Sequence, residues 1–484
     1  MAHAIPQAEA ALAESRPLCV DLDGTLVKSD TLTDSLLVLL RKNPASFLLL
    51  PWHLLRGRAD FKAYVAASTD LDVAHLPYNQ ELLHFLEQEQ TQGRKIYLAT
   101  GADLSVARRV AEHLGLFAEV MGSDGSTNLT GEKKLAALRS VLHSATFDYI
   151  GNDKPDLPLL AQATEPMVAN PSLRLRIALR ARGIQPVRVF QQRSSVFRSL
   201  LRAARIHQWL KNLLIFVPLL LSHMLTREKV VDAMLAFCCF SLTASSAYLV
   251  NDLLDMDADR RHPRKRLRPF AAGNLSAPLG FGVAAVLLVV ALWNAQSLPN
   301  RFYEWLLVYL VSTLAYSISL KRYALVDVLV LSGLYTLRLL AGSAATGTHI
   351  SHWLAGFAVF LFFSLAIAKR FAELENLRAT GSTPKNDRGY QLGDLEQLRS
   401  FGTTSAFAAV VIFAIYISSP DVMPLYHKPH LLWLIMPLMI LWLCRIWLLA
   451  SRGGLHEDPL IFAVTDRMSL LIGAATAVVV LLAV

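Results

Sequence analysis

The sequence predicts two domains of different fold class: an N-terminal α/β domain with an inserted helical cap, and a C-terminal all-α membrane bundle of about nine transmembrane helices. Hydrophobic residues make up 54% of the 484 residues and charged residues only 18%, against about 25% charged in soluble domains. The apolar residues are concentrated in long stretches that begin near Trp209. This distribution excludes a wholly soluble chain, and the high apolar content excludes a disordered one.

Shifts in composition divide the chain into four segments. Residues 1–16 are predicted to be a flexible N-terminus, without the basic region and apolar core of a secretory signal. Residues 17–190 form the predicted α/β domain, in which the helical stretch 29–90 interrupts the first strand–helix unit as a cap. A linker at 191–205 leads into the predicted membrane domain at 206–484.

Nine apolar stretches are long enough for helices that cross a bilayer, whose apolar core of about 30 Å requires about 20 helical residues. They are 208–224, 231–251, 277–296, 303–320, 325–345, 352–369, 402–419, 431–450 and 468–484. Lys and Arg are concentrated in the connections on one side, such as 260–268, and are few on the other. The side rich in Lys and Arg also carries the N-terminal domain and is predicted to face the cytoplasm.

Residues with catalytic chemistry follow the predicted strands of the N-terminal domain. Asp21 and Asp23 end an apolar strand that begins at residue 18, so both carboxylates can point into one site at the carboxyl edge of a sheet. The other elements supply Thr100 after a strand at 95–99, Lys134 at the start of a helical pattern, and Asn152, Asp153 and Asp156 after a strand at 147–150.

These four motifs, in this order, resemble those of the haloacid dehalogenase-like hydrolases, over about residues 17–180, and specifically the phosphatases with a helical cap. The resemblance implies a Rossmann-like sheet, with Asp21 as the nucleophile and Asp23 as the general acid and base. It further implies that Thr100 and Lys134 hold the phosphoryl oxygens. It assigns Mg²⁺ to Asp21, Asp23, Asp153 and Asp156. Asn152 replaces the first acid of the family's fourth motif, so a non-catalytic docking or regulatory domain remains an alternative.

A second group of acids lies at the end of the second predicted span. Asn251, Asp255 and Asp259 are spaced by four and are predicted to share one helical face, with Asp252 beside them. Oxygen ligands of this kind suit Mg²⁺ that is shared with substrate phosphates. Cations that could bind the phosphates follow at once, namely Lys265, Arg266 and Arg268.

The sequence NDLLDMDAD resembles the first motif of the UbiA superfamily of intramembrane prenyltransferases. That resemblance implies a nine-helix bundle whose active site opens to the cytoplasm. The second acidic motif usual for members with aromatic substrates is incomplete, because Leu331 stands four residues after Asp327. Polar and charged residues surround this gap, and they are the predicted substrate-binding residues: Lys211, Asn212, Tyr248, Tyr316, Lys321, Arg322, Asp327, Arg338, Lys369, Arg370 and Glu373.

Over about residues 197–484 the pattern resembles the decaprenyl-phosphate phosphoribosyltransferases. This implies Mg²⁺-dependent transfer of 5-phosphoribose from phosphoribosyl diphosphate to a polyprenyl phosphate in a bacterial inner membrane. Lys and Arg would bind the second anionic substrate, which a second acidic cluster would repel. A phosphatase domain on the same chain would then remove the 5-phosphate from the product.

Other functions remain open at this stage. One alternative is a UbiA-type enzyme that transfers a prenyl group from a prenyl diphosphate to an aromatic or other polar acceptor. Another is a transporter with intramembrane acids, which the density of motifs and the absence of a repeated half disfavour. We expect the membrane and the two phosphate-bearing substrates as partners, and no nucleic acid. A homo-oligomer is compatible with the sequence.

Overall fold

The computed structural model of the protein describes residues 16–142, 146–192, 194–379, 388–455 and 459–484. The predicted flexible segment 1–16 lies, apart from Arg16, outside these ranges. By its internal contacts the chain divides into two compact units. The first unit comprises Met1–Ala203 and Asp252–Gly282, and the second comprises Ala204–Asn251 and Val283–Val484. This grouping differs from the domain order along the chain, because residues 252–282 pack with the N-terminal residues.

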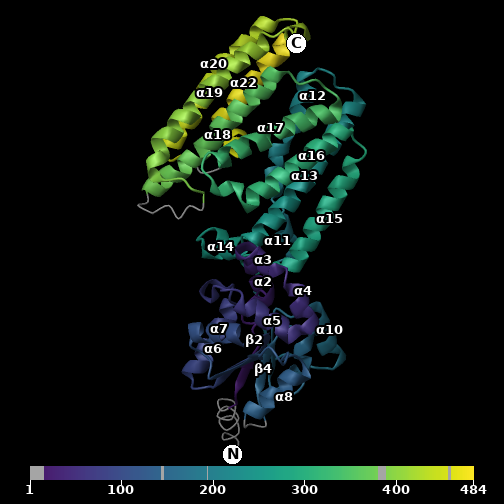
Figure 1. The fold of residues 1–484 in the computed structure, drawn as a ribbon, viewed down its shortest axis with the longest axis vertical. Helices are drawn as coiled ribbons and strands as arrows, with labels where there is room; N and C mark the ends of the chain where they lie inside the picture. Colours follow the sequence, from purple (N-terminus) through teal and green to yellow (C-terminus); the bar gives the residue numbers. More distant parts are fainter. Residues whose placement is uncertain (1–15, 143–145, 193, 380–387, 456–458) are drawn as a thin grey trace, which may run out of the picture. The chain divides into compact units, whose positions relative to one another are not determined.

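A six-stranded parallel sheet forms the centre of the first unit (Figure 1), in the order β3-β2-β1-β4-β5-β6. Its strands are β1 (Leu18–Val20), β2 (Ile96–Asp103), β3 (Glu119–Ser123), β4 (Asp148–Gly151), β5 (Pro166–Ala169) and β6 (Arg188–Phe190). The strand order reverses between β1 and β4, which is where open α/β sheets bind their ligands. The three predicted strands are confirmed, but β2 continues through Thr100 with an irregular register against β3.

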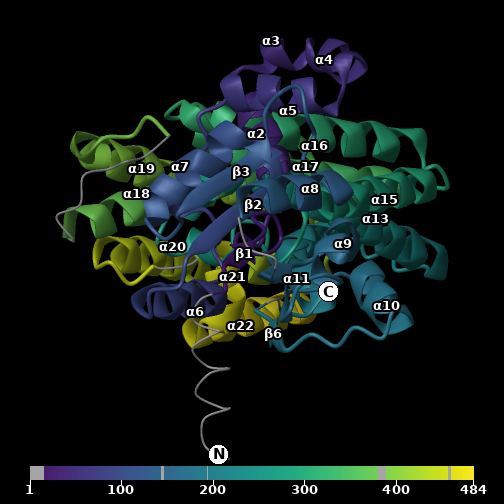
Figure 2. The same ribbon diagram turned by 90° about the horizontal axis from the view of Figure 1, so that it is seen from below.

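Alternate residues of the strands face two separate hydrophobic cores. Leu18 and Val20 pack in one cluster with residues of the helices α6 (Gln80–Thr91) and α7 (Leu104–Leu114). Cys19 lies in the other cluster, with residues of the helices α8 (Glu132–Val141), α9 (Leu157–Leu160) and α10 (Leu173–Ala181). Helices therefore cover both faces of the sheet, α6 and α7 on one side and α8 to α10 on the other (Figure 2).

Short helices inserted between β1 and α6 form the cap. They are α2 (Thr31–Lys42), α3 (Pro44–Phe47), α4 (Leu50–Arg56), α5 (Arg58–Ala67) and the 3₁₀ helix η1 (Val73–His75). The first of them begins at Asp30, whose carboxylate accepts a hydrogen bond from Thr33 N at 2.7 Å and so satisfies a free amide of the first turn. The carboxyl end of the predicted cap range, α6, buries Leu82 and Leu86 in the same core as β1.

Each of the nine predicted spans falls on a helix. These are η3 with α12 (Ile206–Phe216, Val217–Leu221), α13 (Arg227–Leu254), α15 (Ala277–Ala295), α16 (Asn300–Ile318), α17 (Val326–Thr346), α18 (His352–Ala379), α19 (Leu395–Ile417), α20 (Ile435–Ser451) and α22 (Arg467–Ala483). Among the described residues, six helices are long and apolar enough to cross a membrane: α13, α15, α17, α18, and those within Leu392–Ile417 and Pro429–Ser451. A bundle of nine crossing helices therefore stays a prediction.

The connections between these elements contain short helices. They are α11 (Val196–Ala203), which lies within the predicted linker, η2 (Lys154–Asp156), α14 (Met256–Arg261), η4 (Lys265–Leu267), η5 (Leu320–Arg322), η6 (Leu392–Asp394), η7 (Met423–Leu425), η8 (Pro429–Leu434) and α21 (Pro459–Thr465). Two of them, α14 and η4, belong to the segment 252–282 that packs in the first unit.

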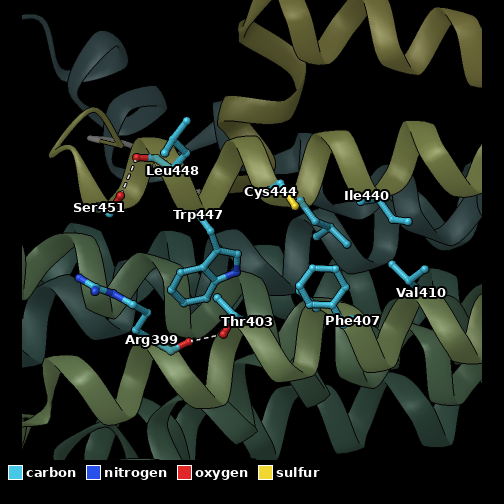
Figure 3. A pocket seen from close by; sticks show the side chains of 11 residues that line it. Arg399, Thr403, Phe407, Val410, Ile440, Cys444, Trp447, Leu448 and Ser451 are labelled. Carbon is cyan, nitrogen blue, oxygen red and sulfur yellow. Dashed lines mark hydrogen bonds between the residues drawn. The ribbon is translucent and has the colours of Figure 1, made fainter.

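Close packing of α18, α19 and α20 in the second unit depends on Gly402. A Cβ atom added there would lie 2.1 Å from the Trp447 ring. The same ring donates from Nε1 to Ser364 Oγ at 3.1 Å, and Ser364 donates to the Gly402 carbonyl at 2.7 Å. A groove of about 410 Å³ between α19 and α20 is lined mainly by apolar side chains (Figure 3) and contains none of the predicted site residues.

A buried ion pair anchors the amino end of β4. Asp148 is fully buried and accepts a hydrogen bond from Arg94, which also binds Glu89 at 2.7 Å. Replacing Arg94 with Ala leaves the Asp148 carboxylate without its main partner, so we expect Arg94→Ala to destabilise the first unit by about 3–5 kcal/mol. Thermal unfolding of the full chain in detergent should show its midpoint lowered by about 6 °C or more. The exposed Arg108→Ala on α7 is the control, and an equal loss in both variants would contradict this role.

Candidate functional site

The four N-terminal motifs meet in one pocket of about 330 Å³ in the first unit. Asp21 and Asp23 follow β1, and Thr100 lies within β2 beside them in the sheet. Lys134 comes from the first turn of α8, and residues 152–156 follow β4. The structure therefore brings together the residues that the sequence assigns to nucleophile, acid and phosphate binding, at the reversal point of the sheet.

Lys134 is held at the centre of this pocket by three oxygen atoms. Its Nζ atom lies 2.9 Å from Asp21 Oδ1 and 3.0 Å from Asp156 Oδ1, and it donates to the Tyr149 hydroxyl at 3.0 Å. Burial lowers the pKa of Lys134, but the two carboxylates outweigh burial and raise that pKa above its ordinary value. The ammonium group therefore keeps its charge and is available to offset repulsion between a carboxylate nucleophile and a phosphate.

Asp21 and Asp23 are buried carboxyl groups whose ionisation the pocket opposes. Burial, partly offset by Lys134, raises the pKa of Asp21 to about 6. Burial and the neighbouring Asp30 raise the pKa of Asp23 well above its ordinary value, although Asp23 Oδ1 accepts a hydrogen bond from Thr31 N at 2.7 Å. This shift favours the protonated form of Asp23, which is the form that a general acid requires.

Asp156, predicted as a metal ligand, is fully occupied with hydrogen bonds. Its Oδ1 atom binds Lys134, and its Oδ2 atom accepts from the amides of Asn152 at 3.0 Å and Asp153 at 3.3 Å. Burial raises the pKa of Asp156, but Lys134 outweighs it and leaves that pKa below its ordinary value. Asp153 accepts from Ser172 Oγ at 2.6 Å. In this arrangement Asp156 positions Lys134, and the metal roles of Asp153 and Asp156 stay predictions.

The chemistry of the pocket fits a divalent cation without showing a complete ligand set. Within the described part of the chain, no group of three or more His, Cys, Asp or Glu side chains has the arrangement of a metal site. Burial is the main cause of the raised pKa values of Asp21 and Asp23, and a cation bound to these carboxylates would favour their charged forms. Asn152 lies against the same loop, because a Cβ added to Gly24 would be 1.9 Å from its Nδ2 atom. Asp21, Asp23 and the Asn152 amide oxygen are hard ligands of the kind Mg²⁺ prefers.

The second acidic motif, at 251–259, is not one continuous helix. The spacing of Asn251, Asp255 and Asp259 predicts a single helical face, but α13 ends at Leu254 and Asp255 has the non-helical angles φ −90° and ψ 1°. The interruption coincides with a side-chain contact, since the Leu254 carbonyl accepts a hydrogen bond from Arg41 at 3.2 Å. The Asp259 amide still donates to the Asp255 carbonyl at 2.8 Å, so the second turn keeps its helical bond.

Guanidinium groups are paired with the acids of this motif. Arg268 Nη1 lies 2.7 Å from Asp259 Oδ2 and 3.2 Å from Asp252 Oδ1. Arg41, on α2, places Nη1 3.0 Å from Asp255 Oδ1. Carboxylates and cations in one place can together hold a metal ion and the diphosphate bound to it.

In the second unit, residues of three elements meet around Arg338, and Lys211 and Asn212 are the predicted substrate-binding residues among them. This buried guanidinium donates from Nε to Asn212 Oδ1 at 2.8 Å and from Nη2 to the Tyr309 hydroxyl at 3.1 Å. Lys211 Nζ lies 5.4 Å from the centre of the Tyr335 ring, and Arg338 lies 5.5 Å from the same ring. A cation in this setting is fixed in place by its neighbours, which favours a defined anion site.

A second group in the same unit neutralises Asp327. Arg370 is buried, with Nε 2.5 Å from Asp327 Oδ2 and Nη1 2.7 Å from Glu373 Oε2. Tyr316 donates to Asp327 Oδ1 at 2.7 Å, and Arg388 lies 3.2 Å from Glu373. Because Arg370 of α18 is paired with Asp327 of α17, it joins these two helices as well as contributing positive charge to the site. Lys321 donates to Asn251 Oδ1 at 3.4 Å. The other predicted residues are the exposed Lys265, Arg266 and Arg322 and the half-buried Tyr248 and Lys369.

The sequence reasoning missed several residues of these sites. Tyr149 shares the hydrogen bonds of the Lys134 centre, and Lys62 lines the pocket from the cap helix α5. Burial lowers the pKa of Lys62, which donates to the Gly101 carbonyl at 2.6 Å. Arg260 belongs to the Lys- and Arg-rich connection 260–268 but not to the predicted site residues, and its place directly after Asp259 is the signal that could have identified it. Arg41 and Lys62 lie in the cap helices with no motif around them, so no sequence signal indicates their role.

A model of the UbiA prenyltransferase family matches residues 215–471, slightly more than half of the chain. The chain belongs to the UbiA prenyltransferase family. The uncharacterized protein y4nM of Sinorhizobium fredii is 38% identical over 95% of this chain and 90% of its own length. The decaprenyl-phosphate phosphoribosyltransferase of Mycobacterium tuberculosis is 35% identical over 48% of this chain and 78% of its own length.

The N-terminal half of this UbiA-family protein is an α/β domain built on a parallel sheet. A HAD family hydrolase from Salmonella enterica has a solved structure that aligns with 33% of this chain and 64% of its own, at 16% identity and a TM-score of 0.26. The resemblance of this half to the haloacid dehalogenase-like hydrolases depends on its four sequence motifs, whose residues meet at the reversal point of the sheet. The chain is therefore an integral membrane protein with a fused α/β domain.

The Lys134 centre generates a prediction about stability. Lys134→Met leaves the Asp21 and Asp156 carboxylates buried without their cation, so we expect a loss of about 3–5 kcal/mol in the first unit. Adding Asp156→Asn to Lys134→Met should recover part of that loss, because it removes one of the two unpaired charges. Thermal unfolding of the full chain measures both, with the exposed neighbour Lys133→Met as the control. If the double variant is no more stable than Lys134→Met alone, pairing of Lys134 with the two carboxylates does not account for the stability that Lys134 contributes.

Proposed function

We propose that the membrane half transfers 5-phosphoribose from phosphoribosyl diphosphate to a polyprenyl phosphate, and that the N-terminal half removes the 5-phosphate from the product. The observation that carries this proposal is the second cluster of the membrane half, where Asp327 is neutralised by Arg370 and Leu331 stands at the position of the second acid of the motif. Two anionic substrates require cations there. The 35% identity to a decaprenyl-phosphate phosphoribosyltransferase supports the same substrate pair.

In the transfer step the protein mainly has to position the two substrates and neutralise the charge of the leaving diphosphate. An oxygen of the lipid phosphate forms a bond to ribose C1, the bond from C1 to the diphosphate oxygen breaks, and the diphosphate leaves with the electron pair. Mg²⁺ bound at Asn251, Asp252, Asp255 and Asp259 would neutralise the leaving diphosphate. Arg268 lies between two of these acids and supplies a further donor. The attacking phosphate is already anionic at neutral pH, so positioning supplies most of the rate.

The phosphatase step uses the pocket of the first unit. Asp21 attacks the phosphorus atom, and the bond from phosphorus to the ribose 5-oxygen breaks as Asp23 donates its proton to that oxygen. Thr100 and Lys134 hold the phosphoryl oxygens, and the Lys134 ammonium offsets their charge. Water then attacks phosphorus with Asp23 as the base, which releases inorganic phosphate and restores Asp21.

A product analysis tests both halves. Full-length protein in nanodiscs with polyprenyl phosphate, phosphoribosyl diphosphate and Mg²⁺ should yield polyprenyl-phosphoryl ribose, detected by mass spectrometry. EDTA should abolish transfer, and Mg²⁺ should restore it. Asp21→Asn should leave the 5-phosphorylated lipid as the end product, because the nucleophile is lost.

Asp255→Asn should lower transfer by about 100-fold or more, because one carboxylate of the diphosphate site is lost. The control is Asp257→Asn, in the same motif but outside the i, i+4 series. Product from a prenyl diphosphate and an aromatic acid, with none from phosphoribosyl diphosphate, would support the alternative UbiA-type prenyl transfer. Unchanged product in Asp21→Asn would exclude the phosphatase step.

The location of both reactions follows from the charge distribution. Lys and Arg are concentrated in the connections on the side of the N-terminal domain, which places both sites at the cytoplasmic face of a bacterial inner membrane in this proposal.

A further inference from the structure

We propose that residues 256–278 form one wall of the phosphatase pocket and adapt it to a phosphate monoester that is anchored in the bilayer by a polyprenyl chain. The inference rests on the proposed phosphatase function and goes further, because it names what selects the substrate. The segment follows the metal motif of the transferase in the sequence, yet it lines the pocket that contains Asp21 and Lys134.

The wall is mostly apolar, in contrast to the catalytic side of the pocket. Phe270 and Leu275 are buried and line the pocket together with Met256 and Pro278. The opposite side carries the carboxylates and Lys134. A free sugar phosphate offers polar groups on all sides and gains nothing from an apolar wall. A phosphate ester that continues into an isoprenoid chain can bury apolar surface there.

Chain connectivity brings this wall to the membrane boundary. The candidate span α13 ends at Leu254, two residues before Met256. The candidate span α15 begins at Ala277, and its first turn includes the pocket residue Pro278. Both ends of the wall are therefore joined directly to membrane-spanning helices. A substrate whose lipid chain stays in the bilayer can reach a pocket with such a wall without leaving the membrane.

Buried contacts inside the first unit fix the wall to the catalytic domain. Arg260 Nη1 lies 2.8 Å from Asp34 Oδ2, and both side chains are almost fully buried. Arg260 also donates to Ser29 Oγ at 3.1 Å and to the Ala271 carbonyl at 3.3 Å. Gly273 has φ +70°, and a Cβ atom there would lie 2.7 Å from the Lys28 side chain. Residues 256–278 are therefore held in place by buried contacts and form a fixed part of the pocket.

The cap of the same unit carries a surface that fits a bilayer. Along α3 and α4, Leu48 is 81% exposed, Trp52 is 63% exposed and Leu55 is 84% exposed. Exposed Arg56 and Arg58 follow them. Large apolar side chains with an aromatic residue and flanking cations are typical of helices that lie in the membrane interface. A cap seated on the bilayer would hold the pocket where an anchored substrate arrives.

A pair of substrates with the same headgroup tests the proposal. One is polyprenyl-phosphoryl 5-phosphoribose in nanodiscs, and the other is its methyl ester analogue in water, with a methyl group in place of the polyprenyl chain. For the full-length protein we expect kcat/KM for phosphate release to be about 100-fold higher with the anchored substrate, because confinement to the membrane raises its effective concentration and the wall binds its chain.

Wall variants separate the two contributions. Leu275→Gln and Pro278→Gln should each reduce the ratio of the two kcat/KM values by about 10-fold, because a polar side chain removes apolar contact. Leu275 is buried, so its replacement could also impair folding. Pro278 is exposed, so Pro278→Gln tests the same apolar contact without that risk. Leu267→Gln changes an exposed leucine of the same segment that does not line the pocket, and should leave the ratio unchanged.

The outcomes distinguish the inference from the proposed function. Equal kcat/KM values for the two substrates, or wall variants that leave the ratio unchanged, would overturn the inference and leave the phosphatase function standing. Hydrolysis of neither substrate by a protein that still transfers phosphoribose would overturn the phosphatase function itself.

Discussion

The buried ion pair between Arg260 and Asp34 is a strong constraint on the first unit. Removing one partner of such a pair leaves an uncompensated charge in the interior, at a cost of about 3–5 kcal/mol. The pair joins a residue that directly follows the metal motif to the first helix of the cap. The salt bridge of Arg41 with Asp255 and the grouping of residues 252–282 with the N-terminal residues connect the same two parts of the first unit.

In the described residues, three acidic clusters are each bridged by a cation. Lys134 of α8 lies between Asp21 and Asp156, Arg268 joins Asp252 to Asp259, and Arg370 joins Asp327 to Glu373. In the low-dielectric environment of a buried site, an acid without such a partner would take up a proton and lose its use for metal or phosphate chemistry. The basic character of the chain is therefore partly structural, because several of its cations are paired with acids.

Local patterns in the sequence predicted the elements well. The nine apolar ranges fall on helices, and the strands before Asp21, Thr100 and Asn152 are present, because both depend on the period and length of apolar runs. The motifs of the pocket could be assembled from strand order alone, since the ends of adjacent parallel strands lie side by side.

Long-range contacts were beyond the reach of those patterns. The break at Asp255 coincides with Arg41, which lies more than two hundred residues earlier in the chain. The role of Asp156 depends on Tyr149 and Lys134 meeting it in a core, and the apolar wall depends on Arg260 finding Asp34. Nothing in the spacing of these residues encodes their partners.

The two ends of the wall, each joined to a membrane-spanning helix, have a consequence for how the chain can be divided. A cut within residues 191–205 follows the domain boundary that the sequence predicts, yet it would leave Phe270 and Leu275 on the fragment that lacks Asp21. Neither fragment would then possess the whole pocket of the first unit. The two halves would have to reassociate as a complementing pair, and the covalent link makes that pairing permanent at a ratio of one to one.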